Sequence, residues 1–134
     1  METTIMQYGF SKTSELSYEQ AIGKVTDELK KEGFGVLTTI DVKDTLKKKI
    51  DVDFKKYVIL GACNPPFAYK ALQEENKIGT MLPCNVIVRE TGNGTVEIAA
   101  VDPVASMKAV ENSKLGGVAV QVQTKLKKVI QNLK

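Results

Sequence analysis

The chain has 134 residues, of which 43% are hydrophobic and 26% are charged, and its formal net charge is +3. These values lie near the averages of globular proteins, so they exclude a disordered chain, a collagen-like chain and a disulfide-rich scaffold, and they predict a single domain over residues 1–134. The sequence has no histidine, which excludes a Ser-His-Asp triad, a Cys-His pair and histidine-containing metal sites within the chain.

The chain carries no sign of export or of a membrane span. No segment approaches the roughly 20 consecutive apolar residues that cross a bilayer, and the N-terminal segment lacks a basic region followed by an apolar one. We therefore predict a cytoplasmic protein with no membrane partner. The lysines are spread along the chain instead of being gathered among aromatic residues, so we expect no nucleic-acid partner.

The N-terminal part of the sequence predicts a strand and then a helix. Residues 3–10 are β-prone and are expected to form a strand that ends near the polar cluster beginning at Ser11. Ser17 and Gln20 have the spacing of a capping box, and apolar residues recur at helical intervals from there until Gly33. This pattern indicates an amphipathic helix with one solvated face.

A charged segment follows a second short strand, which is predicted at residues 34–40. Apolar residues at spacings of four within residues 41–56 predict a short helix in this segment. The lysines at positions 47–49 stand beside several aspartates, so we interpret them as a solvated helix end and not as a binding patch.

The central part of the sequence predicts two strands with a helix between them. Residues 57–62 form a compact apolar run that suits a strand buried on both faces. Asn64 is a favoured N-cap residue and Pro65 suits the first helical position, so a helix is expected from there to Asn76. Residues 84–90 alternate in polarity well enough to predict another strand.

The C-terminal part predicts a hairpin followed by helices. Gly92-Asn93-Gly94 is a strong turn signal before a strand at residues 96–101, and Asp102-Pro103 ends that strand. Residues 104–110 suit one or two helical turns, and residues 115–133 carry an apolar stripe at helical spacing. Together these elements predict an α+β fold of two layers, with a mainly antiparallel sheet of about five strands and helices on one face.

Two Cys-Asn motifs with adjoining prolines mark the ends of the two central strands. The candidate ligand-binding residues are Cys63, Asn64, Pro65, Pro83, Cys84 and Asn85. Whether the two motifs meet depends on strand direction. A helix followed by an extended return segment over residues 77–83 would bring the chain back to the edge it left, and antiparallel strands would then place both thiols at one end of the sheet.

Several kinds of chemistry fit such a shared edge. The amides and neighbouring apolar groups suit a pocket for a small ligand, and two thiolates suit a thiophilic metal ion. A thiol redox protein is the alternative, with Cys63 activated by the helix N-terminus and Cys84 as its resolving partner. A purely structural or interaction module is a further alternative, in which both cysteines are small buried hydrophobic residues. The leading hypothesis is a non-enzymatic or at most weakly catalytic domain that dimerises and binds a small ligand or metal at these motifs, with no assigned catalytic residue or cofactor.

The same motifs carry a resemblance to a known family. The runs YVILGACNP at Tyr57 to Pro65 and LPCNVIV at Leu82 to Val88, followed by Asp102-Pro103, resemble the bacterial and archaeal domain-of-unknown-function family numbered 302. The resemblance covers nearly the whole chain. It implies an α+β fold similar to the TATA-binding-protein-like group and a homodimer, without implying DNA binding or any activity.

Overall fold

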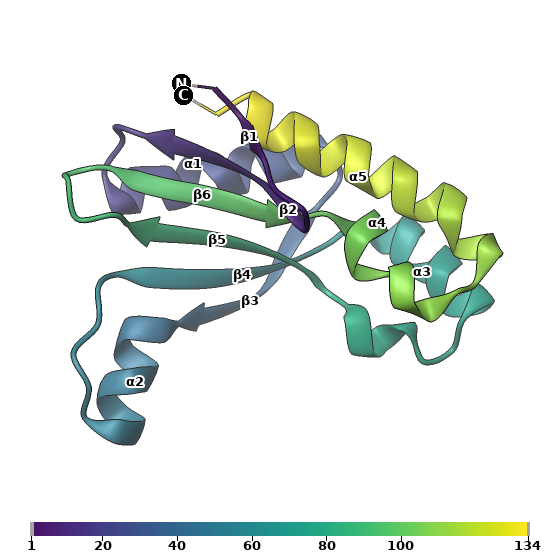
Figure 1. Cartoon of the computed structure of the whole chain (residues 1–134), viewed down its shortest axis with the longest axis horizontal. Coiled ribbons are helices and arrows are strands. Elements are labelled where there is room, and N and C mark those ends of the chain that lie inside the picture. The colour runs from purple at the N-terminus through teal and green to yellow at the C-terminus, as the bar shows by residue number, and fades with distance from the viewer. Residues whose placement is uncertain (1, 134) are drawn as a thin grey trace.

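The structure, a computed structural model, describes residues 2–133 as one antiparallel sheet with helices (Figure 1). The strands are β1 (Thr4–Ile5), β2 (Gly9–Ser14), β3 (Gly35–Asp41), β4 (Tyr57–Cys63), β5 (Cys84–Glu90) and β6 (Val96–Val101). The helices are α1 (Tyr18–Lys31), α2 (Val42–Ile50), α3 (Pro65–Glu74), α4 (Pro103–Ser106) and α5 (Gly116–Gln131). The strand order is β1-β2-β6-β5-β4-β3. The predicted α+β class is therefore confirmed, with six strands in place of about five.

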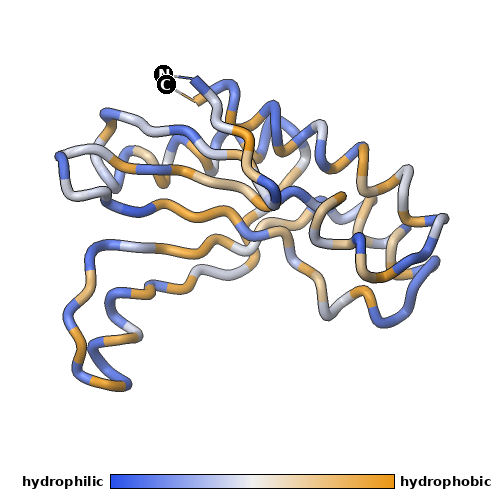
Figure 2. Tube along the Cα trace, viewed as in Figure 1, coloured by the Kyte–Doolittle hydropathy of each residue, from blue (hydrophilic) through white to orange (hydrophobic). Residues whose placement is uncertain are grey.

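One face of the sheet is covered by α1 and α5, and the main core lies between this face and the two helices. Alternate residues of the central strands point to this face, and they include Val58, Leu60, Val86, Val88 and Ile98. The helices meet them with stripes at helical spacing, among them Val25, Leu29, Leu126 and Ile130. Figure 2 shows the apolar residues concentrated along β4, β5 and β6. The opposite face of the sheet carries no helix over its centre (Figure 1).

Local sequence signals produce several of the predicted boundaries. Ser17 and Gln20 form the expected capping box, in which each side chain accepts a hydrogen bond from the other residue's backbone N–H. Gly92 and Gly94 adopt φ values of 101° and 74° in the turn between β5 and β6, a region that favours glycine. The predicted helix start and hairpin are both confirmed.

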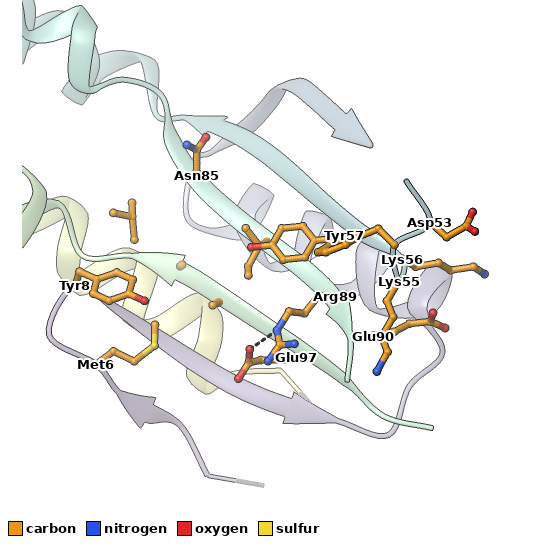
Figure 3. A pocket seen from close by; sticks show the side chains of 15 residues that line it. Met6, Tyr8, Asp53, Lys55, Lys56, Tyr57, Asn85, Arg89, Glu90 and Glu97 are labelled. Atoms are coloured by element: carbon orange, nitrogen blue, oxygen red, sulfur yellow. Dashed lines mark hydrogen bonds and ion pairs between the residues drawn. The ribbon is translucent and has the colours of Figure 1, made fainter. Parts of the chain in front are cut away.

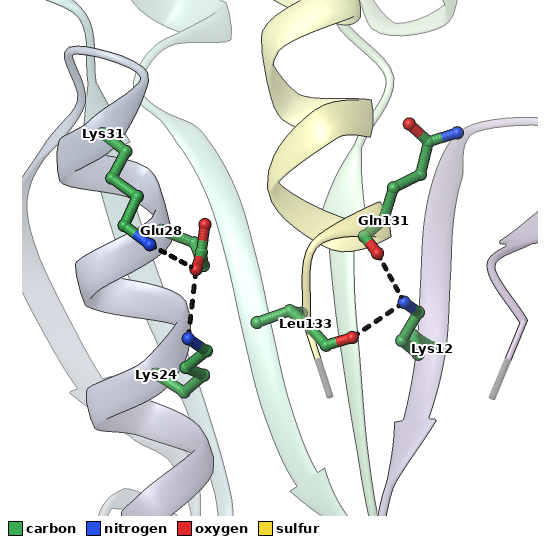
Figure 4. A network of polar contacts seen from close by, with 6 residues as sticks. All are labelled: Lys12, Lys24, Glu28, Lys31, Gln131 and Leu133. Atoms are coloured by element: carbon green, nitrogen blue, oxygen red, sulfur yellow. Dashed lines mark hydrogen bonds and ion pairs between the residues drawn. The ribbon is translucent and has the colours of Figure 1, made fainter.

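The prediction for the first strand was wrong in its boundaries. β2 runs through the polar cluster that was expected to end it, and only Thr4–Ile5 of the predicted segment forms a separate short strand. The cause is Lys12, which is buried and donates from Nζ to the carbonyl oxygens of Gln131 (2.8 Å) and Leu133 (2.9 Å) (Figure 4). A polar residue can therefore occupy the core side of β2 because the end of α5 supplies its partners.

The segment between α3 and β5 also differs from its prediction. α3 ends at Glu74, and the return contains a 3₁₀ turn at Ile78–Met81 instead of an extended chain. Ile78 fills a small second core with Ala71 and Leu115. Burial of this isoleucine gives the return segment its compact shape.

β3, α2 and the segment that leads into β4 form an arm that projects from the body (Figure 1). We call these residues, 35–56, the arm. α2 has no buried residue. Five large apolar side chains of the arm are exposed: Leu37, Ile40, Ile50, Val52 and Phe54. The expected solvated lysines are present too, with Lys47 paired to Asp51 and Lys48 paired to Asp44.

Candidate functional site

The two cysteines lie at the same end of the sheet, which is the arrangement expected if the two central strands are antiparallel. β4 and β5 are antiparallel, and Cys84 pairs with Ala62, the residue before Cys63. Both cysteines are free thiols. Together with Asn64, Pro83 and apolar residues that include Phe67, they line a cavity of about 30 Å³. This is space for one water molecule and not for an organic ligand.

Four of the six predicted site residues therefore meet, and two lie elsewhere. Pro65 is exposed at the start of α3. Asn85 is exposed and follows Cys84 in β5, so strand alternation places it on the opposite face of the sheet. The structure does not bring these two residues to the cavity.

Asn64 has a structural contact that its position did not predict. It occupies the N-cap of α3, but its side chain makes no capping hydrogen bond. Its Nδ2 group donates to the carbonyl oxygen of Glu32, the C-cap of α1, at 3.1 Å. This side chain therefore joins the start of one helix to the end of another.

Burial favours the neutral form of both thiols. It raises the pKa of Cys84 to about 11, with a smaller contribution from the neighbouring Cys63, and it also raises the pKa of Cys63. This direction is opposite to the lowering expected for Cys63 from its place before α3. Within residues 2–133, no group of three or more Cys, Asp, Glu or His side chains is placed to hold a metal ion.

A larger hollow lies on the helix-free face of the sheet (Figure 3). We call it the sheet groove. Its volume is about 770 Å³, and it extends between the segment after β1, which holds Met6 and Tyr8, and the base of the arm, which holds Phe54 and Lys55. Asn85 lies in its wall (Figure 3).

Two rows of side chains cross the face on which the groove lies. Strand pairing places Ile40, Ile59, Ile87 and Ala99 in one apolar row. The next row holds Tyr57, Arg89 and Glu97 in register across β4, β5 and β6. The floor of the groove is therefore apolar along one line and polar along the line beside it.

The charges of the groove are unevenly placed. Arg89 Nε donates to Glu97 Oε1 at 2.8 Å in the floor, while Asp53, Lys55 and Glu90 stand at the end near the arm (Figure 3). The opposite end holds Tyr8, Met6 and Asn85, which are uncharged (Figure 3). An amphipathic molecule would find apolar contacts and polar partners in the same hollow.

The strand pattern of the sequence contains a signal for the residues of this groove. The alternation of β5 and β6 places Ile87 and Ala99 on one face with Arg89 and Glu97. The prediction missed the groove because the sequence does not show which sheet face the helices leave uncovered.

A family model described as domain of unknown function DUF302 matches residues 10–133. A crystal structure of an uncharacterized conserved DUF302 protein from Bacillus stearothermophilus is similar to the chain, with a TM-score of 0.85 and 28% sequence identity, and the match covers 93% of this chain and 97% of that one. No curated protein matches the chain significantly. Among the helices of residues 2–133, none has the length and apolar character needed to cross a membrane.

Proposed function

The chain belongs to the DUF302 family, whose function is unknown, and we propose that it is a binding domain that holds a small amphipathic molecule in the sheet groove. The groove's volume of about 770 Å³ supports this, because pockets for small molecules measure roughly 300–1,000 Å³. The main support for this proposal is a pair of adjacent rows of side chains on the groove floor. One row is apolar, with Ile87 and Ala99, and the other is polar, with Arg89 and Glu97. Such rows fit a molecule with an apolar body and a polar group.

Fragment binding measured by NMR tests this proposal. The probe is a set of fragment-sized aromatic acids, amides and amines, added to the full chain labelled with ¹⁵N. We expect fragments to shift the backbone amides of β4, β5 and β6 that surround the groove. The proposal is wrong if no fragment shifts these amides, or if the shifts gather at another surface.

A filled groove provides the second arm of the test. Ile87→Trp places a large side chain on the groove floor, while Val120→Trp places the same side chain on the exposed part of α5. We expect Ile87→Trp to weaken fragment binding by at least about tenfold and Val120→Trp to leave it unchanged. Thermal unfolding of both variants shows whether each has kept its fold.

A second candidate site is the cavity at the two cysteines, as the sequence predicts. It is supported by the meeting of Cys63, Asn64, Pro83 and Cys84 around one space. A thiophilic metal ion or a very small ligand fits this space better than an organic molecule does. Native mass spectrometry of protein purified without chelator tests it. The expected result is a bound mass that is lost in Cys63→Ser and Cys84→Ser, and an unbound wild-type chain rejects the site.

Two broader features complete the proposal. We propose a cytoplasmic location, which the two free thiols support because they suit a reducing compartment.

We also propose a homodimer formed through the arm. Its exposed Ile50, Val52 and Phe54 lie among both acidic and basic residues, so a two-fold axis can match this surface to a second copy of itself.

A further inference from the structure

The sheet groove holds an arginine whose hydrogen-bonding capacity is mostly unused by the protein. Arg89 lies in β5 and its side chain is 41% exposed. A guanidinium has five N–H donors, and Arg89 uses its Nε donor on Glu97. Within residues 2–133, no other acidic side chain forms an ion pair with Arg89. Its terminal nitrogens are therefore available to a molecule in the groove.

Glu97 holds this arginine in place. The two residues are paired across β5 and β6, and the bond from Nε to the carboxylate measures 2.8 Å. A planar guanidinium that is fixed through Nε presents its two terminal nitrogens as a fork, and such a fork matches the two oxygens of a carboxylate. Glu97 is thus a positioning residue, while Arg89 makes the contact with the ligand.

The surroundings of Arg89 favour a flat apolar body attached to that carboxylate. Ile87 and Ala99 lie one row away, and the small side chain of Ala99 leaves space above the floor. Tyr57 is the register neighbour of Arg89 in β4, and Phe54 contributes a second aromatic ring at the same end of the groove. Aromatic and aliphatic side chains of this kind pack well against a planar ring.

We propose that the sheet groove binds aromatic carboxylates, with the carboxylate on the terminal nitrogens of Arg89 and the ring over Ile87 and Ala99. This inference rests on the proposed function, because it names the class of molecule that the same groove takes. It also assigns the selectivity to charge. A neutral molecule of the same shape keeps the apolar contacts and loses the charge-assisted hydrogen bonds.

A matched pair of probes tests the inference. 2-Naphthoate and 2-naphthamide have the same ring system and differ in the charge of the attached group. We expect the naphthoate to bind the wild-type chain at least about tenfold more tightly than the amide in an NMR titration. Arg89→Gln should remove this preference, while Lys114→Gln on the distant, exposed surface should leave it intact.

The outcomes separate this inference from the proposal on which it rests. If both probes shift the groove amides with equal affinity, the carboxylate inference is overturned and the groove remains a binding site. If the naphthoate keeps its advantage in Arg89→Gln, the assignment to Arg89 is wrong. If neither probe shifts the groove amides but other fragments do, only the ligand class fails. If no fragment binds there, both proposals fail.

Discussion

Several polar residues take their roles from partners that are distant in the sequence. Asn64 is a good N-cap by residue type, yet its side chain donates to the backbone carbonyl oxygen of Glu32 at the C-cap of α1. Cys63 stands before a helix, yet burial raises the pKa of its thiol. In both cases the tertiary surroundings outweigh the local pattern, because burial removes water and leaves the side chain to the partners that packing supplies.

The buried thiol of Cys84 should show its raised pKa in its reaction with an alkylating agent. Burial raises the pKa of Cys84 to about 11, from the ordinary value of 9.0. Only the thiolate reacts with iodoacetamide, so the alkylation rate of Cys84 in the Cys63→Ser variant should still be rising at pH about 10, where an ordinary thiol has nearly levelled off. Mass spectrometry after timed labelling measures the rate.

The half-buried Cys63 gives the comparison. In the Cys84→Ser variant we expect it to react faster than Cys84 does, yet more slowly than a thiol in the unfolded chain. Labelling in denaturant sets the unfolded rate for both variants. Fast labelling of Cys84 near pH 7 in the native protein would contradict its burial and would favour the thiol redox alternative.

At the scale of elements, local signals decide some boundaries and distant contacts decide others. The capping box at Ser17 and the glycine turn at Gly92 and Gly94 act over a few residues, so the sequence alone predicts them. β2 is different, because Lys12 finds its partners at the other end of the chain. The local sequence pattern shows only a polar cluster at this position, so the strand predicted from it ends too early.

The contact of Lys12 leads to a stability prediction. Its ammonium group donates to two carbonyl oxygens at the end of α5, which also lie at the negative end of the helix dipole. Lys12→Met keeps the apolar stem and removes the donor. We expect it to lower the free energy of unfolding by about 1–3 kcal/mol, as measured by urea denaturation.

An exposed lysine supplies the control for this change. Lys49 lies on α2, which has no buried residue, so Lys49→Met should change the unfolding free energy by no more than about 0.5 kcal/mol. α1 contains a second buried charge, Glu28, which accepts a hydrogen bond from Lys31 and forms an ion pair with Lys24 (Figure 4). An unchanged stability of Lys12→Met would mean that water replaces the ammonium group without cost.

In the whole molecule, the two faces of the sheet differ in whether helices cover them. The sequence alternation of β5 and β6 marks apolar residues on both faces, but it does not show that α1 and α5 cover only one. The mainly antiparallel sheet was predicted, and the antiparallel pairing of β4 with β5 places both cysteines at one end of it. The sheet groove and the arm were not, because both are defined by surfaces that no other element covers.

The exposed arm supports a prediction about assembly. The short helix α2 has no buried residue and gains little stability from packing on its own chain. Ile50, its last residue, is 63% exposed, and Phe54 in the segment after it is 43% exposed. Aspartate at both positions should raise the dimer dissociation constant by about 100-fold or more, because each charge would have to be buried without a partner in the interface. Analytical ultracentrifugation measures the association. The double variant should keep the native circular dichroism spectrum, since neither side chain contributes to the core.

Aspartates at Tyr69 and Leu72, which are equally exposed on α3, should leave the dimer intact. A wild-type chain that stays monomeric at high concentration, or a dimer that survives the arm variant, would show that the arm serves another purpose.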